Sequence, residues 1–184
     1  MRHRSQVRNA VQTQDGVCRV NRVRDGEMQH FEIRLAIAED CPDLFDVHRQ
    51  SVRSLCSGDY TGEQIDMWLD GRHPGMYLLA IERGELWVAV SSGVLLGLVE
   101  VQGNEVTKLF VSGAAVGAGV GKALMGQAIA HIRQAGENRI YLESTLTGRD
   151  FYRKLGFTEI GSGTFSHGPG TVSLEIVQME LHVD

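Results

Sequence analysis

Three glycines at alternate positions, Gly117, Gly119 and Gly121, have the spacing and type of residue that could bind a phosphate group. They follow an apolar stretch that starts at Leu109, and we expect them in the first turn of a helix. Glycine has no side chain, so a ligand can approach its backbone closely. Amide N–H groups and the positive end of the helix dipole attract phosphate at a helix start. The stretch therefore predicts a phosphate-binding loop.

Two common phosphate-binding motifs do not fit this loop. A P-loop requires G-x-x-x-x-G-K-[ST], but Val116 stands at its first glycine and Ala123, which cannot bind Mg²⁺, follows the lysine. A dinucleotide-binding fingerprint requires G-x-G-x-x-G after the first parallel strand of a βαβ unit. Here the spacing is G-x-G-x-G, and the preceding strand ends a predicted antiparallel meander. Nucleotide hydrolysis and dinucleotide binding are therefore disfavoured.

The elements that must position this loop predict one mixed α/β domain. A strand is expected over 31–36, followed by a helix that begins near Asp40 and ends near Leu55. Thr61 and Gln64 form a capping box at the start of a second helix. Residues 74–83 predict a short helix, with a strand over 77–81 as the alternative.

Three strand-like runs then form an antiparallel meander immediately before the glycines, because turn residues separate them. After the glycines, a helix with one apolar face ends at Gly136. The remaining elements are a strand at 140–143, a helix at 148–155, and strands near 157–161 and 172–181. The meander strands are expected at 86–90, 94–101 and 106–111.

Composition and charge exclude several classes of protein. The 184 residues, 42% of them hydrophobic, are enough to bury a core in one domain. No apolar run could span a bilayer, and the N-terminus lacks the apolar stretch of a secretory signal, so we expect a cytoplasmic protein without a membrane partner. Cys18, Cys41 and Cys56 are widely spaced and predict free or buried thiols rather than a metal site.

The charge is unevenly distributed along the chain. The net charge of −5 argues against nucleic acid as a partner. Residues 1–30 nevertheless hold six arginines and three acidic residues, with few large apolar side chains. We expect a flexible basic tail over 1–30 and the domain over 31–184. A solvated extension without a role is favoured over an arm that binds an acidic partner.

Two motifs taken together resemble the GNAT superfamily of N-acetyltransferases. V-G-A-G-V-G-K-A-L (116–124) follows K-L-F-V, and D-F-Y-R-K-L-G-F (150–157) comes about 30 residues later, in an order of elements that matches over about 32–181. The resemblance implies a central mixed, mainly antiparallel sheet that is splayed at the coenzyme A site and has helices on both faces. It also implies acetyl-CoA as the acyl donor and no metal. Neither motif contains cysteine, so direct transfer in a ternary complex is expected.

The resemblance assigns the acetyl-CoA site residue by residue. The backbone of Leu109, Phe110 and Val111 would pair with the pantetheine arm, and the Val111 amide would bind the thioester carbonyl. The pyrophosphate loop would comprise Val116, Gly117, Ala118, Gly119, Val120, Gly121, Lys122 and Ala123. The family usually has Arg or Gln where Val116 stands, which predicts the loss of one cofactor contact. A glycine-rich turn that serves only packing is the alternative reading.

The same resemblance implies two roles for Tyr152. It would be the general acid that protonates the coenzyme A sulfur, and it would also contact the cofactor. The alternative is a tyrosine that packs the last helix. Glu105, Glu143 and Glu100 are candidates for the general base, and the choice among them stays open. A substrate that arrives as a free amine would need no base.

The resemblance implies an acceptor site for a primary amine over the splayed strands. Candidates to bind the amine are Tyr60, Trp68 and His167, and a surface loop histidine without a role is an equal alternative for His167. The acidic domain mildly favours a cationic small molecule. His48 is interpreted as a half-buried helix residue. A different acyl-CoA donor and a non-catalytic acyl-CoA-binding sensor are the competing hypotheses, and a homodimer is possible.

Overall fold

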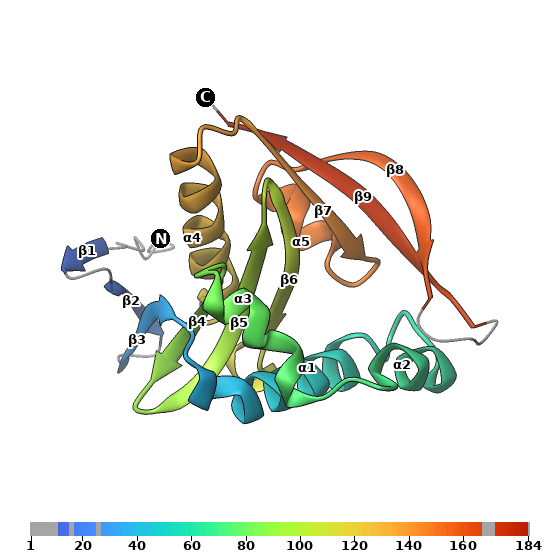
Figure 1. Cartoon of the computed structure of the whole chain (residues 1–184), viewed down its shortest axis with the longest axis horizontal. Helices are drawn as coiled ribbons and strands as arrows, with labels where there is room; N and C mark the ends of the chain where they lie inside the picture. Colours follow the sequence, from blue (N-terminus) through green and yellow to red (C-terminus); the bar gives the residue numbers. More distant parts are fainter. Residues whose placement is uncertain (1–10, 15–16, 25–26, 167–171, 184) are drawn as a thin grey trace, which may run out of the picture.

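The meander expected in the middle of the chain forms the centre of a nine-stranded sheet with strand order β1-β2-β3-β4-β5-β6-β7-β9-β8 (Figure 1). The computed structural model describes residues 11–14, 17–24, 27–166 and 172–183. The strands are β1 (Val11–Gln14), β2 (Val17–Arg24), β3 (Glu27–Leu35), β4 (Leu86–Ser91), β5 (Val94–Gln102), β6 (Glu105–Val111), β7 (Arg139–Thr145), β8 (Thr158–Phe165) and β9 (Leu174–His182). Neighbouring strands pair antiparallel except β6 and β7, which are parallel.

Helices cover both faces of this sheet. They are α1 (Cys41–Leu55), α2 (Gly62–Leu69), α3 (Leu78–Glu82), α4 (Val120–Gln134) and α5 (Arg149–Lys154), with 3-10 turns η1 (Ala38–Asp40), η2 (Pro74–Tyr77) and η3 (Gly113–Ala115). α4 and α5 pack on one face, in a core that includes Leu124 and Tyr152. α1 and α3 pack on the other, around Leu44 and Leu98. The mixed, helix-flanked sheet predicted from the sequence is confirmed.

Local signals in the sequence place most of the helix ends correctly. The Thr61 amide donates to Gln64 Oε1 at 2.9 Å, and the Gln64 amide donates to Thr61 Oγ1 at 3.3 Å, so the capping box is confirmed. The segment 74–83 is helical, as η2 and α3, and not a strand. The carboxylate of Asp40 does not cap α1 as expected. It accepts hydrogen bonds from the Arg34 guanidinium and the Ile37 amide instead.

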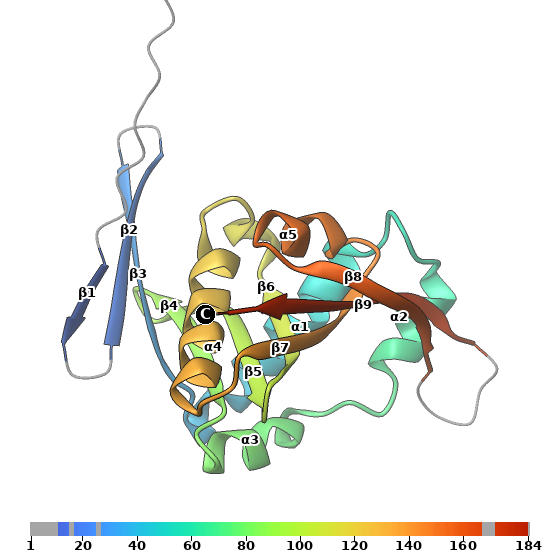
Figure 2. The ribbon, with the colours of Figure 1, turned by 90° about the horizontal axis from the view of Figure 1, so that it is seen from above.

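The described residues among the first 30, namely 11–14, 17–24 and 27–30, lie in strands, whereas a flexible tail was expected. β1 and β2 form an antiparallel hairpin, and β2 pairs with β3 from Cys18↔Ile33 to Arg24↔Glu27, across the expected boundary at residue 30 (Figure 2). β3 therefore begins four residues before the expected strand at Phe31. The valines of β2 are spaced by three, so no period of two was visible in the sequence. Strand pairing needs only backbone groups, which the edge of β3 supplies.

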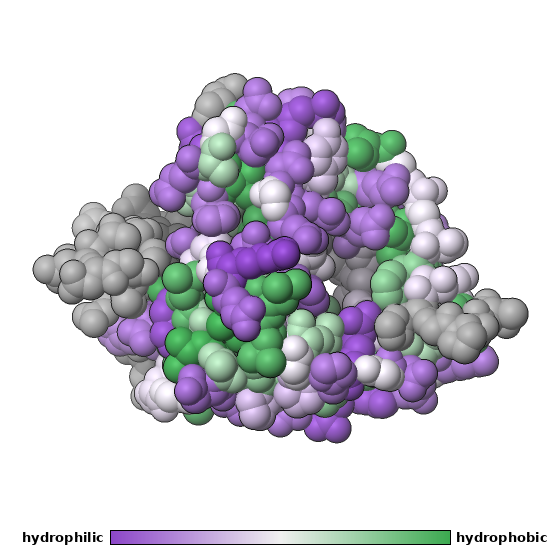
Figure 3. All heavy atoms as spheres, viewed as in Figure 1, coloured by the Kyte–Doolittle hydropathy of each residue, from purple (hydrophilic) through white to green (hydrophobic). Residues whose placement is uncertain are grey.

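Exposed apolar residues on α3 and two buried thiols are further features of the fold. Figure 3 shows an apolar area over α3, where Leu78 and Leu79 are exposed. The thiols of Cys41 and Cys56 are free and buried, as expected. Within the described part of the chain, no helix has the length and apolar character needed to cross a membrane.

Candidate active site

A β-bulge at Thr107 lies where β6 and β7 part. Glu100 of β5 pairs with Lys108, but the next residue, Val101, pairs with Val106, so Thr107 is an extra residue on β6. The pairing of β6 with β7 covers only Glu105↔Tyr141 and Val106↔Leu142 and ends there. A bulge bends its strand and increases its twist. β6 therefore diverges from β7 beyond the bulge (Figure 1), and this divergence is the predicted splay of the sheet.

The register beyond the bulge decides which backbone groups face the open side of β6. The Ser112 amide donates to the Leu96 carbonyl at 2.8 Å, and Val111 pairs with Gly97. In an antiparallel pair, hydrogen-bonded and non-hydrogen-bonded residues alternate. The N–H and C=O groups of Val111, and by the same rule those of Leu109, therefore point away from β5 into the splay.

The same alternation turns the backbone of Phe110 toward Leu98 of β5, so these groups are not free for a ligand as the resemblance implied. The Phe110 side chain packs on the α1 face of the sheet instead. Phe110 is therefore better placed to contact an acceptor than the pantetheine arm.

The start of α4 leaves amide groups available beside the splay. Gly117 and Gly119 lie before the helix, with φ angles of 79° and 87°. Only Gly121 is in the first turn, where all three glycines were expected. The Ala123 amide makes the first helical bond, to the Gly119 carbonyl. The N–H groups of the three residues between them have no acceptor within the helix. The Ala118 amide, in contrast, donates to the Ala115 carbonyl, so it is not free as predicted.

The first turn of α4, the end of β6 and α5 converge at Gly121. A Cβ added there would lie 3.3 Å from the Phe151 ring and 3.5 Å from Val111 Cγ2. The next residue of α5, Tyr152, is 9% exposed and packs edge-on against Phe151 and Phe157. Burial raises the pKa of the Tyr152 phenol, so the hydroxyl stays protonated near neutral pH. Burial alone shifts this pKa, with no contribution from a hydrogen bond to another described residue, so a ligand can be the partner of the hydroxyl.

A cavity of about 150 Å³ opens on the opposite face of the sheet, between β6 and β7 and above α1 and α2. Figure 3 shows a hollow on this side of the molecule. Glu105 of β6 and Glu143 of β7 both line the cavity. Partial burial, and then the Glu143 carboxylate, raise the pKa of Glu105. Such a carboxylate is a better proton acceptor near neutral pH than an ordinary glutamate.

Glu100, the third candidate base, does not line this cavity. Its Oε1 accepts hydrogen bonds from Lys108 Nζ at 2.5 Å and from Thr107 Oγ1 at 2.9 Å, and its side chain is 12% exposed. These contacts hold the bulge together. The geometry therefore favours a positioning role for Glu100.

The residues predicted to bind the acceptor are only partly brought together. Trp68 lines the cavity with Phe165, but Tyr60 does not. The Tyr60 hydroxyl donates to the Glu175 carbonyl at 2.6 Å and accepts from the Leu146 amide at 2.8 Å, so it joins β9 to the chain after β7. His167 lies outside the described residues.

His48 is more deeply placed than the half-buried position expected from the sequence. It is 1% exposed, lines the cavity and stacks on Phe110 with ring centroids 3.8 Å apart. Its Nδ1 lies 2.8 Å from the Tyr77 hydroxyl oxygen. Burial, and then the positive charges of Arg72 and Lys108, lower the pKa of His48 to about 3, so the ring is neutral.

A comparison with protein families matches residues 56–181 to the acetyltransferase (GNAT) domain. The chain belongs to the GNAT acetyltransferase family. The family inferred from the two motifs is thereby confirmed. No curated protein matches the sequence.

Solved structures share the fold of this GNAT domain at low sequence identity. A GCN5-related N-acetyltransferase from Rhodopseudomonas palustris has a TM-score of 0.73 at 20% identity, covering 82% of this chain and 94% of the other. The PaiA N-acetyltransferase of Thermoplasma acidophilum, in complex with coenzyme A, has a TM-score of 0.68 at 23% identity, covering 83% and 99%. A GNAT phosphinothricin acetyltransferase of Sinorhizobium meliloti, in complex with acetyl-CoA, has a TM-score of 0.62 at 18% identity, covering 82% and 87%.

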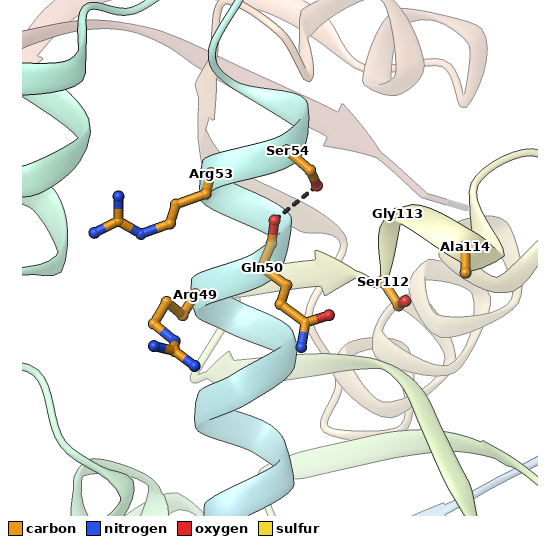
Figure 4. A pocket seen from close by; sticks show the side chains of 7 residues that line it. All are labelled: Arg49, Gln50, Arg53, Ser54, Ser112, Gly113 and Ala114. Carbon is orange, nitrogen blue, oxygen red and sulfur yellow. Dashed lines mark hydrogen bonds between the residues drawn. The ribbon is translucent and has the colours of Figure 1, made fainter.

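A second, open groove of about 600 Å³ lies between α1 of the GNAT domain and the turn after β6 (Figure 4). Arg49 and Arg53 line it, but each pairs with a carboxylate, Asp46 at 3.0 Å and Asp66 at 2.9 Å. Both side chains point away from Ser112 at the opposite wall (Figure 4). The cavity beside the splay is therefore the better candidate for acceptor binding.

Sequence reasoning missed two cations that line the cavity between β6 and β7, Arg72 and Lys108. Arg72 lies after α2 in a stretch without a recognisable motif. Lys108 could have been found as a cross-strand partner of Glu100, since opposite charges on neighbouring strands commonly pair. Among the described residues, no group of three His, Cys, Asp or Glu side chains could hold a metal ion.

Proposed function

We propose that this protein transfers the acetyl group of acetyl-CoA directly to a primary amine within a ternary complex. The observation that carries the proposal is the parting of β6 and β7 at Thr107. The free amides of α4 and Tyr152 lie on one side of this opening, and the cavity with Glu105 and Glu143 lies on the other. Two reactants could therefore enter from opposite faces and meet at the gap. Coenzyme A and acetyl-CoA bound to proteins of the same fold support this arrangement.

The first turn of α4 would hold the pyrophosphate of acetyl-CoA, because its amides and dipole favour an anion. The Val111 N–H faces the gap and would donate to the thioester oxygen, where negative charge develops in the transition state. A new C–N bond forms as the C–S bond breaks. The leaving thiolate takes a proton from the Tyr152 hydroxyl, which burial keeps protonated.

The amine must lose its proton before or during the attack. Glu105, with its raised pKa, is the favoured acceptor of that proton, directly or through water. Glu143 is the alternative base, and its charge adds to the effect of burial in raising the pKa of Glu105. An amine that arrives uncharged would bypass both carboxylates.

A screen for thiol release from acetyl-CoA with a panel of primary amines tests the proposal. Tyr152→Phe keeps the ring and its packing, and should lower kcat about a hundredfold or more with little change in KM. Propionyl-CoA and succinyl-CoA in the same assay test the choice of donor. If the protein binds acetyl-CoA, acetylates no amine and is unaffected by the substitution, a non-catalytic acyl-CoA-binding domain becomes the better description.

A further inference from the structure

We infer that the acceptor is a dipolar amine, an amino acid whose carboxylate is bound by Arg72 and whose side chain is apolar. This inference rests on the proposed function and names the substrate class for the same cavity. It modifies the expectation of a cationic acceptor, because basic as well as acidic side chains line the cavity.

Arg72 is a fixed cation without an acidic partner among the described residues. Its Nε donates to the Trp68 carbonyl at 2.6 Å, and its guanidinium lies 5.9 Å from the centre of the Phe165 ring. The two contacts hold the side chain at the cavity wall, and no described residue accepts a hydrogen bond from its terminal N–H groups. Partial burial lowers the pKa of the guanidinium, as expected for a cation that lacks a counter-charge. A planar guanidinium binds a carboxylate through two parallel hydrogen bonds.

His48 provides a second donor on the same side of the cavity. Within the described residues, Nε2 is buried and has no hydrogen-bond partner. If Nδ1 donated to the Tyr77 oxygen, the phenolic hydrogen and the Nε2 lone pair would both be unpaired. The opposite assignment, in which Tyr77 donates to Nδ1, leaves only the Nε2 hydrogen unpaired and is therefore favoured. The cavity wall near Arg72 then offers donors and suits an oxyanion.

Lys108 also lines the cavity, but its charge is already compensated by Glu100. Arg72 is thus the cation left to bind an acidic group of a ligand. The two remaining charges, Glu105 and Glu143, are acceptors that suit an ammonium group. A substrate that carries one positive and one negative group can pair with Glu105 or Glu143 and with Arg72.

The rest of the cavity selects for a small, apolar body. Trp68, Phe110 and Phe165 supply aromatic surface, and Leu174 and Ile176 supply aliphatic surface. The volume of about 150 Å³ is below that of typical drug-sized ligand pockets. Amino acids with an apolar side chain fit this combination of charge, shape and size.

Paired substrates test the inference directly. L-leucine and L-phenylalanine are compared with L-leucinamide and L-phenylalaninamide, which keep the amine and the side chain but lack the negative charge. The quantity measured is the ratio of kcat/KM for the acid to that for the amide. Arg72→Gln should lower this ratio about tenfold to a hundredfold, because it removes charge-assisted hydrogen bonds to the acid only. Comparing ratios between variants cancels the different basicity of the two amines.

Arg72→Lys and Arg83→Gln provide the matched controls. Arg72→Lys keeps the positive charge and should retain part of the preference, whereas Arg83→Gln, at an exposed site after α3, should leave the ratio unchanged. Equal use of acids and amides by the wild type would overturn the inference, as would an equal loss for both in Arg72→Gln.

A binding measurement separates failure of the inference from failure of the proposed function. N-acetyl-L-leucine should raise the Tm of the wild type more than N-acetyl-L-leucinamide does, and Arg72→Gln should abolish the difference. Absence of thiol release with every amine would reject the enzyme, but the Tm difference would still support a carboxylate site. Identical Tm shifts for acid and amide would reject the carboxylate site whatever the activity.

Discussion

The Thr107 hydroxyl donates a 2.9 Å hydrogen bond to the Glu100 carboxylate at the bulge where β6 leaves β7. The same Glu100 oxygen also accepts from Lys108 Nζ. One buried carboxylate on β5 is therefore bonded to the extra residue of the bulge and to the residue that follows it. The opening that the proposed reaction needs depends on this arrangement.

Glu100→Ala should destabilise the fold and lower activity together. It leaves the Lys108 ammonium, 19% exposed, without its partner and removes the acceptor of Thr107. We expect a loss of about 3 kcal/mol in the free energy of unfolding, measured by urea denaturation. Glu100→Gln still accepts from Thr107 and should retain more of both stability and activity. A Glu100→Gln protein that is fully folded but inactive would instead support Glu100 as the base.

The pH dependence of kcat/KM should report on Glu105. A base must be ionised, so activity rises as pH increases through its pKa, which lies above the ordinary value for glutamate. Glu143→Gln removes the neighbouring charge that contributes to this shift, and should move the acidic limb of the profile to lower pH. Glu105→Gln should remove that limb. If both variants kept the pH profile of the wild type, neither carboxylate would be the base.

Glu105→Gln should also leave the protein at least as stable as the wild type near pH 7. The pKa of Glu105 is raised in the folded state, so folding favours the protonated form. Its contribution to stability is greatest below the unfolded-state pKa and is lost as pH rises through the folded-state value. Urea denaturation at pH 7 measures this, and clear destabilisation would indicate a favourable interaction of the ionised carboxylate.

His48 should make the protein sensitive to acid. Its folded-state pKa of about 3 lies below the ordinary value of 6.5, so below pH 6.5 the unfolded chain binds a proton that the folded protein does not. Each pH unit in this range should cost about 1.4 kcal/mol of stability, or about 2 kcal/mol between pH 7 and pH 5. His48→Gln should lose this dependence, and substitution of the exposed His73 should not. An unchanged slope in His48→Gln would refute the assignment.

Val116 offers a gain-of-function test at the phosphate-binding loop. The side chain is 50% exposed and precedes Gly117, so Val116→Gln should not disturb the core. One added hydrogen bond to the cofactor should lower the KM for acetyl-CoA about threefold to tenfold. Val94→Gln, at a site 61% exposed in the β4–β5 hairpin, is the matched control. A KM that does not change would mean that the backbone amides alone account for binding.

The sequence by itself determined the family and most of the elements. The glycines near 117–121 and the motif around Tyr152 are local patterns, as is the capping box at Thr61 and Gln64. Such signals act over a few residues, so they are visible without the fold. The same local reasoning failed for residues 17–24, since pairing with β3 supplies what their own pattern lacks.

Only the tertiary structure decided which side chains share the cavity proposed to bind the acceptor. Arg72 and Glu143 come from separate elements and line the same cavity because α1 and α2 pack beneath the sheet. No sequence motif contains both residues, so their proximity could not be predicted. The choice among the three glutamates was also tertiary. Glu100 and Glu105 differ in burial and partners and not in type, because the bulge at Thr107 commits one to Lys108 and leaves the other facing Glu143.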